Sequence, residues 1–312
     1  MSDYSARVGE LFDDQLKEWD LARDNYRQLD NVMTRKFSYP CFDLFVQFNP
    51  GRITSSAAKV DARSIEARPC FLCEKNRPPQ QKGVAYEDDY VILINPFPIF
   101  RRHLTIVSES HTDQRIAPNF VTMLDLARCL PEYSVFYNGP QCGASAPDHL
   151  HFQAGNRGFM PVERDFGKKS LCRIQAVNEG IELWSWEEYR RGIVTLRGTD
   201  RYALMRAFEK FYLRFELMQP DRPEPMLNII ICYSEGNWIV HVIPRKLHRP
   251  SCFFAEGKDK IVLSPASVDM GGVLITPREE DYLKITSRDI NDILDQVCLT
   301  EDEIESLTSD II

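Results

Sequence analysis

Apolar side chains recur along this chain at two spacings, and each spacing predicts a different kind of element. From residue 5 to residue 30 they follow helical spacing among many charges, which predicts an amphipathic helix docked on the body of the protein. Further along, runs of β-branched and aromatic residues favour strands. In the first half, strands are predicted at 36–53, 90–100, 103–111, 133–140 and 149–155, and a short helix at 119–130.

The same kinds of element recur, more loosely, in the second half of the chain. Hairpins mixed with isolated helices are typical of an α+β fold rather than of a βαβ repeat. We therefore expect antiparallel sheets with packed helices and a weak internal duplication, with one domain over residues 1–165 and another over residues 166–312. The predicted elements of the second half are strands at 172–178 and 193–198, helices at 200–218, 276–285 and 287–298, the last capped by Ser287, and a hairpin over 226–245 that turns at 235–237.

Composition narrows the class of protein. The 312 residues are enough for two domains that each bury a core, and 43% hydrophobic with 27% charged residues is typical of soluble globular proteins. The first residues carry no apolar signal sequence, and no stretch reaches the roughly 18 apolar residues of a membrane span, so we expect a cytoplasmic protein. The nine cysteines are expected to be reduced thiols, among which a close pair is a candidate metal site.

The charges are unevenly distributed. A net charge of -8 argues against a general nucleic-acid surface, because such binding depends on dense lysine and arginine patches. Basic residues nevertheless cluster at 101–103 and again at 245–249. Local positive pockets on an acidic protein suit small phosphorylated ligands, and a solvated basic rim is the alternative interpretation of each cluster.

The stretch SAPDHLHFQAG, residues 145–155, holds the clearest candidate chemistry. On a strand, alternate side chains share a face, so His149, His151 and Gln153 would line one surface while Leu150 and Phe152 point into a core. A histidine with one ring nitrogen fixed by a hydrogen bond can attack phosphorus, and a nearby amide can stabilise the charge that develops. The preceding run NGPQCGAS has small residues and backbone amides that could approach a phosphate closely. A surface strand with two histidines by chance is the alternative.

A CxxC pair, Cys70 and Cys73, is the second candidate. Two thiolates on a tight turn can chelate one Zn²⁺, but a closed tetrahedral site needs two more ligands. A redox pair or two buried thiols would have the same spacing. The histidines considered as further ligands are His103, His111, His149, His241 and His248.

The sequence from His149 to Gln153, with Asn138 eleven residues before His149 and the segment NPFPIFRRHLTIVSESH upstream, resembles the histidine-triad (HIT-like) superfamily. The glutamine in place of a third histidine resembles the transferase branch, which comprises galactose-1-phosphate uridylyltransferase, diadenosine-tetraphosphate phosphorylase and the GDP-hexose phosphorylases. This resemblance implies two tandem HIT-like domains, of which only the first keeps the catalytic motif. It also implies nucleotidyl transfer.

Roles for particular residues follow from the same resemblance. His151 corresponds to the histidine that becomes nucleotidylated, and Gln153 to the glutamine that steadies the intermediate and favours transfer over hydrolysis. Asn138 and Ser145 correspond to residues that contact the phosphoryl group. A structural zinc is implied as cofactor, with the ligands Cys70, Cys73, His111 and His149.

Further substrate contacts are expected around this motif. Asn95 stands at a strand end beside a proline turn, where it could bond a ribose hydroxyl. Arg52, in a polar run with Ser55, Ser56 and Lys59, resembles the arginine-bearing segment of the uridylyltransferases and is expected at a phosphate or sugar. An ordinary surface loop is the alternative for both basic segments. The residues expected to close over the acceptor or the distal phosphate are Arg245, Lys246, His248 and Arg249.

We therefore expect a nucleotidyltransferase or phosphorylase that acts on an NDP-sugar or dinucleoside polyphosphate through a nucleotidyl-His151 intermediate. Phosphate or a sugar 1-phosphate would be the acceptor. A hexose-1-phosphate uridylyltransferase, a nucleotide-binding protein without chemistry, and an interaction scaffold that uses the N-terminal helix are the alternatives. Neither nucleic acid nor a membrane is an expected partner, and a duplicated chain favours a monomer over a homodimer.

Overall fold

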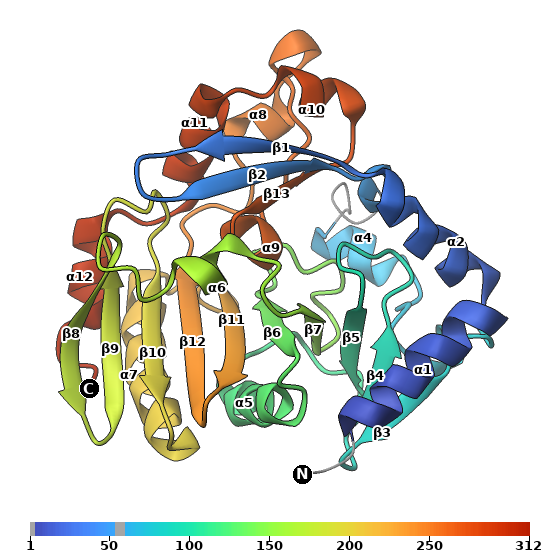
Figure 1. The fold of residues 1–312 in the computed structure, drawn as a ribbon, viewed down its shortest axis with the longest axis horizontal. Coiled ribbons are helices and arrows are strands. Elements are labelled where there is room, and N and C mark those ends of the chain that lie inside the picture. The colour runs from blue at the N-terminus through green and yellow to red at the C-terminus, as the bar shows by residue number, and fades with distance from the viewer. Residues whose placement is uncertain (1–3, 54–59) are drawn as a thin grey trace.

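Two sheets form the framework of the protein, whose computed structural model describes residues 4–53 and 60–312. Among these residues, ten strands form one antiparallel sheet in the order β3-β4-β5-β7-β6-β11-β12-β10-β9-β8 (Figure 1). A three-stranded sheet of β1, β2 and β13 lies across it, at the top of the view. The strands are β1 (Met33–Ser38), β2 (Asp43–Phe48), β3 (Gly83–Tyr86), β4 (Tyr90–Ile94), β5 (His103–Ser108), β6 (Tyr133–Asn138), β7 (His151–Asn156), β8 (Cys172–Asn178), β9 (Ile181–Trp186), β10 (Val194–Gly198), β11 (Leu227–Ser234), β12 (Asn237–Pro244) and β13 (Val273–Thr276).

The large sheet contains one five-stranded pattern twice. From edge to centre, the first half has the order β3-β4-β5-β7-β6 and the second half the order β8-β9-β10-β12-β11. The two halves meet where β6 pairs antiparallel with β11, with Asn138 opposite Asn228. In each half a helix follows the third strand: α5 (Phe120–Cys129) in the first and α7 (Arg201–Met218) in the second. The expected antiparallel α+β fold and its internal duplication are confirmed, whereas the domain boundary at residue 165 stays a prediction.

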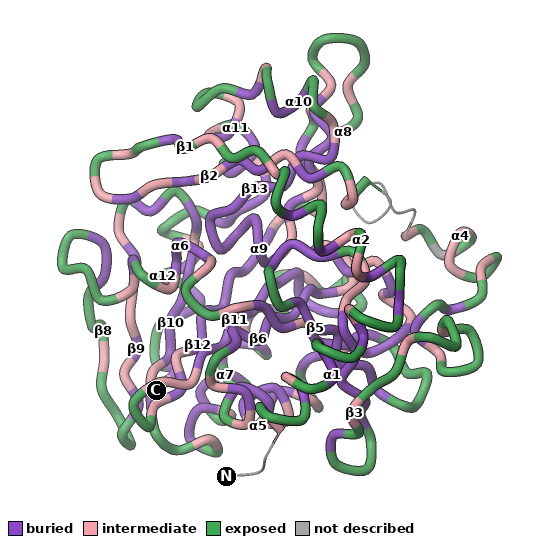
Figure 2. Tube along the Cα trace, turned by 45° about the vertical axis from the view of Figure 1, so that its right-hand side comes forward, coloured by how far each residue is buried: buried purple, intermediate pink, exposed green. Residues whose placement is uncertain are grey.

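Each face of the large sheet has its own core. Strand residues such as Leu104 and Phe152 pack with the helices of one face, while Phe136 and Ile243 pack on the opposite face with the small sheet. Figure 2 shows the buried segments running through both sheets and the exposed ones at the rim. None of the helices in the described part of the chain could span a bilayer. The remaining helices are α1 (Tyr4–Glu18), α2 (Asp20–Gln28), α4 (Ala62–Glu66), α6 (Pro161–Asp165), α8 (Ser251–Phe254), α9 (Ser267–Met270), α10 (Glu279–Lys284), α11 (Ser287–Val297) and α12 (Glu301–Thr308).

Two N-terminal elements differ from the prediction. The single helix expected over residues 5–30 is broken at Trp19, which adopts extended backbone angles of φ -117° and ψ 99° and buries its side chain. The single strand expected over residues 36–53 is a hairpin of β1 and β2. Pro40 lies in its turn, since a proline cannot donate the backbone hydrogen bond that a continuous strand requires.

Two other boundaries are shifted. Strand β7 begins at His151, so His149 lies in the preceding turn rather than on the strand. The N-cap of α11 is Thr286 and not Ser287, because the Thr286 hydroxyl accepts the backbone N–H of Asp289 while the Asp289 carboxylate accepts the N–H of Thr286.

Glu224, from the segment before β11, ties the second half to the first. Its carboxylate accepts the backbone N–H of Ile116 at 2.6 Å and the hydroxyl of Tyr137 at 2.7 Å, and the side chain is buried. Burial raises the pKa of this carboxyl from 4.5 to about 7, although both hydrogen bonds favour the ionised form. The folded state therefore holds this proton more tightly than the unfolded state does.

This proton predicts a pH-dependent stability. Because the folded pKa is raised, the stability that Glu224 contributes is complete below pH 4.5 and is lost as the pH rises through about 7. Over this window we expect the free energy of unfolding of the wild type to fall by about 3 kcal/mol because of Glu224. This decline should be absent from the Glu224→Gln variant. Urea titrations of both proteins at about pH 4 and about pH 8 measure it. The control is Glu209→Gln on the exposed face of α7, and an equal decline in wild type and Glu224→Gln would contradict the prediction.

Candidate active site

His151 is the first residue of strand β7, and hydrogen bonds fix both its main chain and its ring. Its Nδ1–H donates to the backbone carbonyl of His149 at 2.8 Å. Because a carbonyl can only accept, this bond fixes the neutral tautomer and leaves the Nε2 lone pair for the cleft that His151 lines. Burial lowers the pKa of the ring to about 4, which keeps it uncharged near neutral pH. A neutral, oriented imidazole is the form that attacks phosphorus.

Gln153 is oriented by a residue that the sequence prediction did not place here. His103, at the start of the neighbouring strand β5, is fully buried, and its Nδ1 accepts the backbone N–H of Ile99 at 3.2 Å. Its Nε2–H must therefore donate to Gln153 Oε1, which lies 3.0 Å away. Burial lowers the pKa of His103 to about 3, in keeping with this neutral form. The Gln153 amide nitrogen is consequently the end that faces a ligand.

Asn138, at the end of β6, has its amide oriented in the same way. Its Oδ1 accepts the backbone N–H of Ser267 at 2.8 Å and the Nδ2–H of Asn228 at 3.0 Å. Both partners come from the second half of the chain. Two N–H donors on this oxygen leave the Nδ2 group of Asn138 for the cavity that this residue lines.

Four predicted metal ligands converge at the other end of the motif. The donor atoms of Cys70, Cys73, His111 and His149 all lie within 4.8 Å of one another. Sulfur–nitrogen distances are 3.3 Å from Cys70 to His149 and 3.2 Å from Cys73 to His111, and the two Nδ1 atoms are 3.2 Å apart. A tetrahedral zinc at about 2.3 Å from sulfur and about 2.0 Å from nitrogen separates its ligands by roughly 3.5 Å. These four residues could therefore hold a metal ion.

The ionisable side chains of this group shift one another's pKa values. Burial opposes ionisation of the Cys70 thiol, but the hydrogen bonds from His149 and from the backbone amides outweigh it and lower the pKa to about 6. Burial and the Cys70 thiolate raise the pKa of Cys73. Burial opposes protonation of His149, but the hydrogen bonds to Cys70 and Ser108 outweigh burial and raise the pKa of this ring. His149 donates its Nε2–H to the carbonyl of Ser108 at 2.7 Å, which turns Nδ1 toward the two sulfurs.

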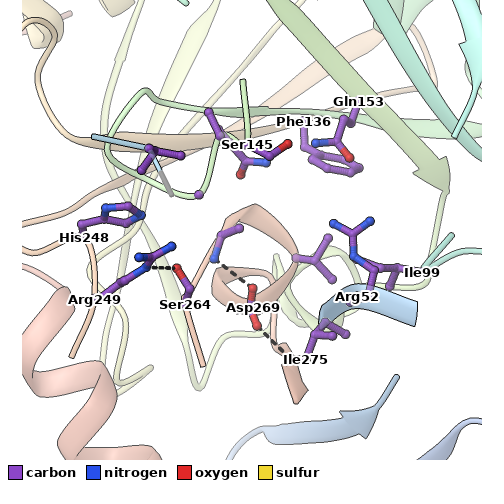
Figure 3. Close-up of a pocket in the computed structure, with 16 residues that line it drawn as sticks. Arg52, Ile99, Phe136, Ser145, Gln153, His248, Arg249, Ser264, Asp269 and Ile275 are labelled. Carbon is purple, nitrogen blue, oxygen red and sulfur yellow. Dashed lines mark hydrogen bonds between the residues drawn. The ribbon is translucent and has the colours of Figure 1, made fainter. Parts of the chain in front are cut away.

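Two cavities meet at Gln153. The larger, about 740 Å³, contains His151 and has a wall of apolar side chains that includes Trp19, Phe71 and Phe97. The smaller is polar and is drawn in Figure 3, where Arg52 extends toward Gln153, with Arg249 and Asp269 further along the cavity. The residues common to both cavities are Arg52, Ser145 and Gln153.

Two family models and several solved structures are similar to this chain. Residues 11–156 match the family model described as a domain of unknown function (DUF4922), and residues 166–312 match the model described as the GDPGP1-like C-terminal domain. The structure of yeast Ap4A phosphorylase Apa2 is similar over 94% of this chain and 98% of that chain, with 16% sequence identity and a TM-score of 0.56. This likeness shows a HIT-like fold.

Two further structures of the yeast enzyme, in complex with AMP and with Ap4A, are similar to the same degree. Each is 16% identical, covers 90% of this chain and 97% of that chain, and has a TM-score of 0.57. At this identity the likeness establishes the HIT-like fold with its two tandem units. No curated protein matches the chain in sequence.

The residues of the basic segment after β12, 245–249, have different roles. Arg245 is fully buried, and all five of its N–H groups donate to oxygens of the protein. One of these oxygens is Asn228 Oδ1, at 2.9 Å. Arg245 therefore supports the loop and Asn228 rather than a ligand. His248 and Arg249 line the polar cavity, where burial lowers the pKa of both side chains and Arg249 donates to Ser264 Oγ at 2.9 Å. Lys246 is absent from the described linings of both cavities.

The other predicted contacts lie at the cavities. Arg52 donates to the carbonyl of Phe97 at 2.7 Å, and burial lowers its pKa to about 10, which leaves it cationic. Asn95 lines the apolar cleft, but its amide already bonds Thr105 Oγ1 at 3.1 Å and the N–H of Phe97 at 2.9 Å. Ser145 lines both cavities. Ser55, Ser56 and Lys59, the other members of the polar run around Arg52, are outside the described residues.

Proposed function

We propose that this HIT-like protein is a nucleotidyltransferase that works by double displacement, and that phosphorolysis of an NDP-sugar or a dinucleoside polyphosphate is its reaction. The observation that carries the proposal is the neutral imidazole of His151, whose Nδ1–H is committed to the His149 carbonyl, which leaves the Nε2 lone pair for the cleft that His151 lines. The nearby amide groups of Gln153 and Asn138 support it, since each has its oxygen anchored by the protein and its nitrogen left for a ligand. Binding alone would not require an oriented nucleophile.

The chemistry balances without a separate base. His151 Nε2 attacks the α-phosphorus, and the bond to the bridging oxygen breaks, so that a sugar 1-phosphate or a nucleotide leaves as an anion. The resulting nucleotidyl-imidazole is cationic because Nδ1 keeps its proton, and the His149 carbonyl stabilises that charge. An oxygen of inorganic phosphate then attacks the same phosphorus, the P–N bond breaks, and neutral His151 is restored. The amides of Gln153 and Asn138 would donate to the phosphoryl oxygens.

The two cavities divide the substrate between them. The apolar wall of the larger cleft suits a nucleoside, because ligand pockets combine apolar surface with a few placed polar groups. The smaller cavity suits the acceptor phosphate, since Arg52 and Arg249 both line it and guanidinium groups bind phosphate oxygens through paired hydrogen bonds. The α-phosphoryl group would lie at the boundary, beside Ser145 and Gln153, where His151 can reach it.

We assign zinc to the group formed by Cys70, Cys73, His111 and His149. The ion would be structural: it would neutralise the two thiolates and hold the turn that precedes β7. His149 belongs to this group through its ring and to the His151 site through its carbonyl. Zinc bound to the His149 ring would therefore hold the His149 carbonyl in place, and that carbonyl fixes the orientation of the His151 ring.

A substrate panel tests the proposed function. GDP-, UDP- and ADP-sugars and diadenosine tetraphosphate are each incubated with the protein, with and without phosphate, and the products are separated by anion-exchange chromatography. We expect phosphate-dependent release of a nucleoside diphosphate from at least one of them. Release of a nucleoside monophosphate without phosphate would indicate a hydrolase. In a parallel incubation, turnover with a hexose 1-phosphate but not with phosphate would indicate the uridylyltransferase alternative. Nucleotide binding without any turnover would contradict the proposal.

Gln153 gives a second prediction within this mechanism. In the Gln153→Glu variant the oxygen bonded to His103 is retained, but a carboxylate oxygen replaces the amide donor and faces the phosphoryl group. We expect kcat for phosphorolysis to fall by about 10²–10³-fold, as when one donor to a developing anion is removed. Gln175→Glu, on the remote strand β8, is the control for the added charge. A kcat within about threefold of wild type would remove Gln153 from the mechanism.

A further inference from the structure

Strands β6 and β7 stop pairing next to the nucleophile. Their last pair joins Phe136 to Gln153, and continuing that register would place Asn138 opposite His151. The side chain of Gln114 is inserted there instead. It is fully buried, its Nε2 donates to the carbonyls of both Asn138 and His151 at 3.0 Å, and its Oε1 accepts the N–H of His151 at 2.8 Å.

Only one orientation of this amide satisfies its partners. Two carbonyl oxygens require the NH₂ end and one N–H requires the oxygen, so a flipped amide would set like groups against each other. The main chain that carries Gln114 is held as well: its own N–H donates to the carbonyl of Pro147 at 3.1 Å, and the carbonyl of Thr112 accepts the N–H of Leu150 at 2.7 Å. Gln114 therefore has a defined position independent of any ligand.

We propose that Gln114 is a positioning residue for nucleotidyl transfer, a spacer that keeps Asn138 and His151 one carboxamide apart. Direct pairing at this position would bring the two strands together and close the gap between the nucleophile and the amide that faces the same phosphoryl group. The spacer also joins these two residues into one unit, because a single amide bonds the main chain of both. The effect of Gln114 on kcat rests on the proposed function, whereas its effect on the spacing of Asn138 and His151 does not.

The chain offers a matched control in Gln15 of α1. This glutamine is also fully buried, its Nε2 donates to the carbonyl of Gln80 at 3.0 Å, and its Oε1 accepts the N–H of Lys82 at 3.0 Å. Gln114→Ala and Gln15→Ala thus remove the same side chain from equally buried sites. Gln114→Met and Gln15→Met, which keep the volume and remove only the hydrogen bonds, serve if an alanine variant does not fold.

Steady-state kinetics, metal content and thermal unfolding are measured on all variants. We expect both substitutions to lower Tm, but only the Gln114 variants to lose kcat, by about 100-fold, because a displaced nucleophile costs that much even when binding is intact. KM and the metal content should stay within about threefold of wild type. An equal loss of kcat in the Gln15 variants, or no loss in the Gln114 variants, overturns the proposal.

Hydrogen exchange separates this inference from the proposed function. The amide proton of His151 is followed in the absence of substrate, where Gln114 Oε1 is its acceptor. We expect its exchange to be about 100-fold faster in Gln114→Met and unchanged in Gln15→Met. Unchanged exchange in Gln114→Met overturns the spacer role, whatever the substrate panel gives. If exchange is faster in Gln114→Met but the wild type turns over none of the substrates, the spacer role is supported. Only the proposal of nucleotidyl transfer is then contradicted.

Discussion

The His151→Ala variant is expected to lose about 10⁴-fold or more of kcat and to form no covalent adduct, since removing a nucleophile abolishes the pathway that it opens. The wild-type protein should become labelled when it is incubated with an α-³²P nucleotide substrate, and phosphate should release the label as a nucleoside diphosphate. Among residues 4–53 and 60–312, the side chain of His151 makes one hydrogen bond, to the His149 carbonyl. Its removal should therefore leave a folded protein that still binds nucleotide.

A second buried histidine gives the control for this experiment. His241 lies on β12, the strand that takes the place of β7 in the other half of the sheet, and its Nδ1 is 2.8 Å from the hydroxyl oxygen of Thr195. His241→Ala removes an equally buried imidazole and should keep kcat within about threefold of wild type. Labelling of the His151→Ala variant at the wild-type rate would place the nucleophile elsewhere.

Metal removal is expected to have the second largest effect. The protein should bind one zinc ion per chain through Cys70, Cys73, His111 and His149, and Cys70→Ser should lose it. Because the metal binds only the folded chain, zinc at about 1,000 times its dissociation constant stabilises the protein by about 4 kcal/mol. Chelation should therefore lower Tm in the wild type and change little in Cys70→Ser. Elemental analysis and thermal unfolding measure both results.

Cys252→Ser is the matched control for the metal prediction. Cys252 is a half-buried thiol outside the four-residue group, so its replacement should leave the zinc content and the response to chelator as in wild type. A wild-type protein that contains no zinc after growth in zinc-supplemented medium, and whose Tm ignores the chelator, would refute the assignment.

The sequence alone predicts the position of those residues whose role follows from the local pattern of apolar, polar and metal-binding side chains. Alternation along residues 150–153 predicted which side chains enter the core, and the structure buries Leu150 and Phe152 accordingly. The CxxC pair and the two histidines were predicted as one group and lie together. Most strands and helices were found from their spacing, because a buried face requires the same periodicity whatever the tertiary contacts.

What the sequence could not show are roles set by tertiary pairing. His103 orients Gln153 across fifty residues of chain, and Gln114 reaches His151 only because the loop after β5 runs alongside the turn before β7. A glutamine or histidine in such a segment carries no local signature of its partner. Arg245 shows the converse: its place in a basic cluster suggested a phosphate contact, but the carbonyl groups that surround it consume all its donors.

The parallel pairing of β2 with β13 has a consequence for the order in which the protein is completed. The Thr276 hydroxyl donates to the carbonyl of Gln47 across 229 residues of sequence, and Arg52 follows directly after β2. At synthesis rates of about 5–20 residues per second, the hairpin of β1 and β2 leaves the ribosome roughly 10–50 s before its partner strand exists. The wall that brings Arg52 to the phosphate cavity can therefore be completed only after β13 has been made. A nascent or truncated chain without β13 would thus have an unfinished phosphate cavity, and the activity should appear only once β13 has been synthesised.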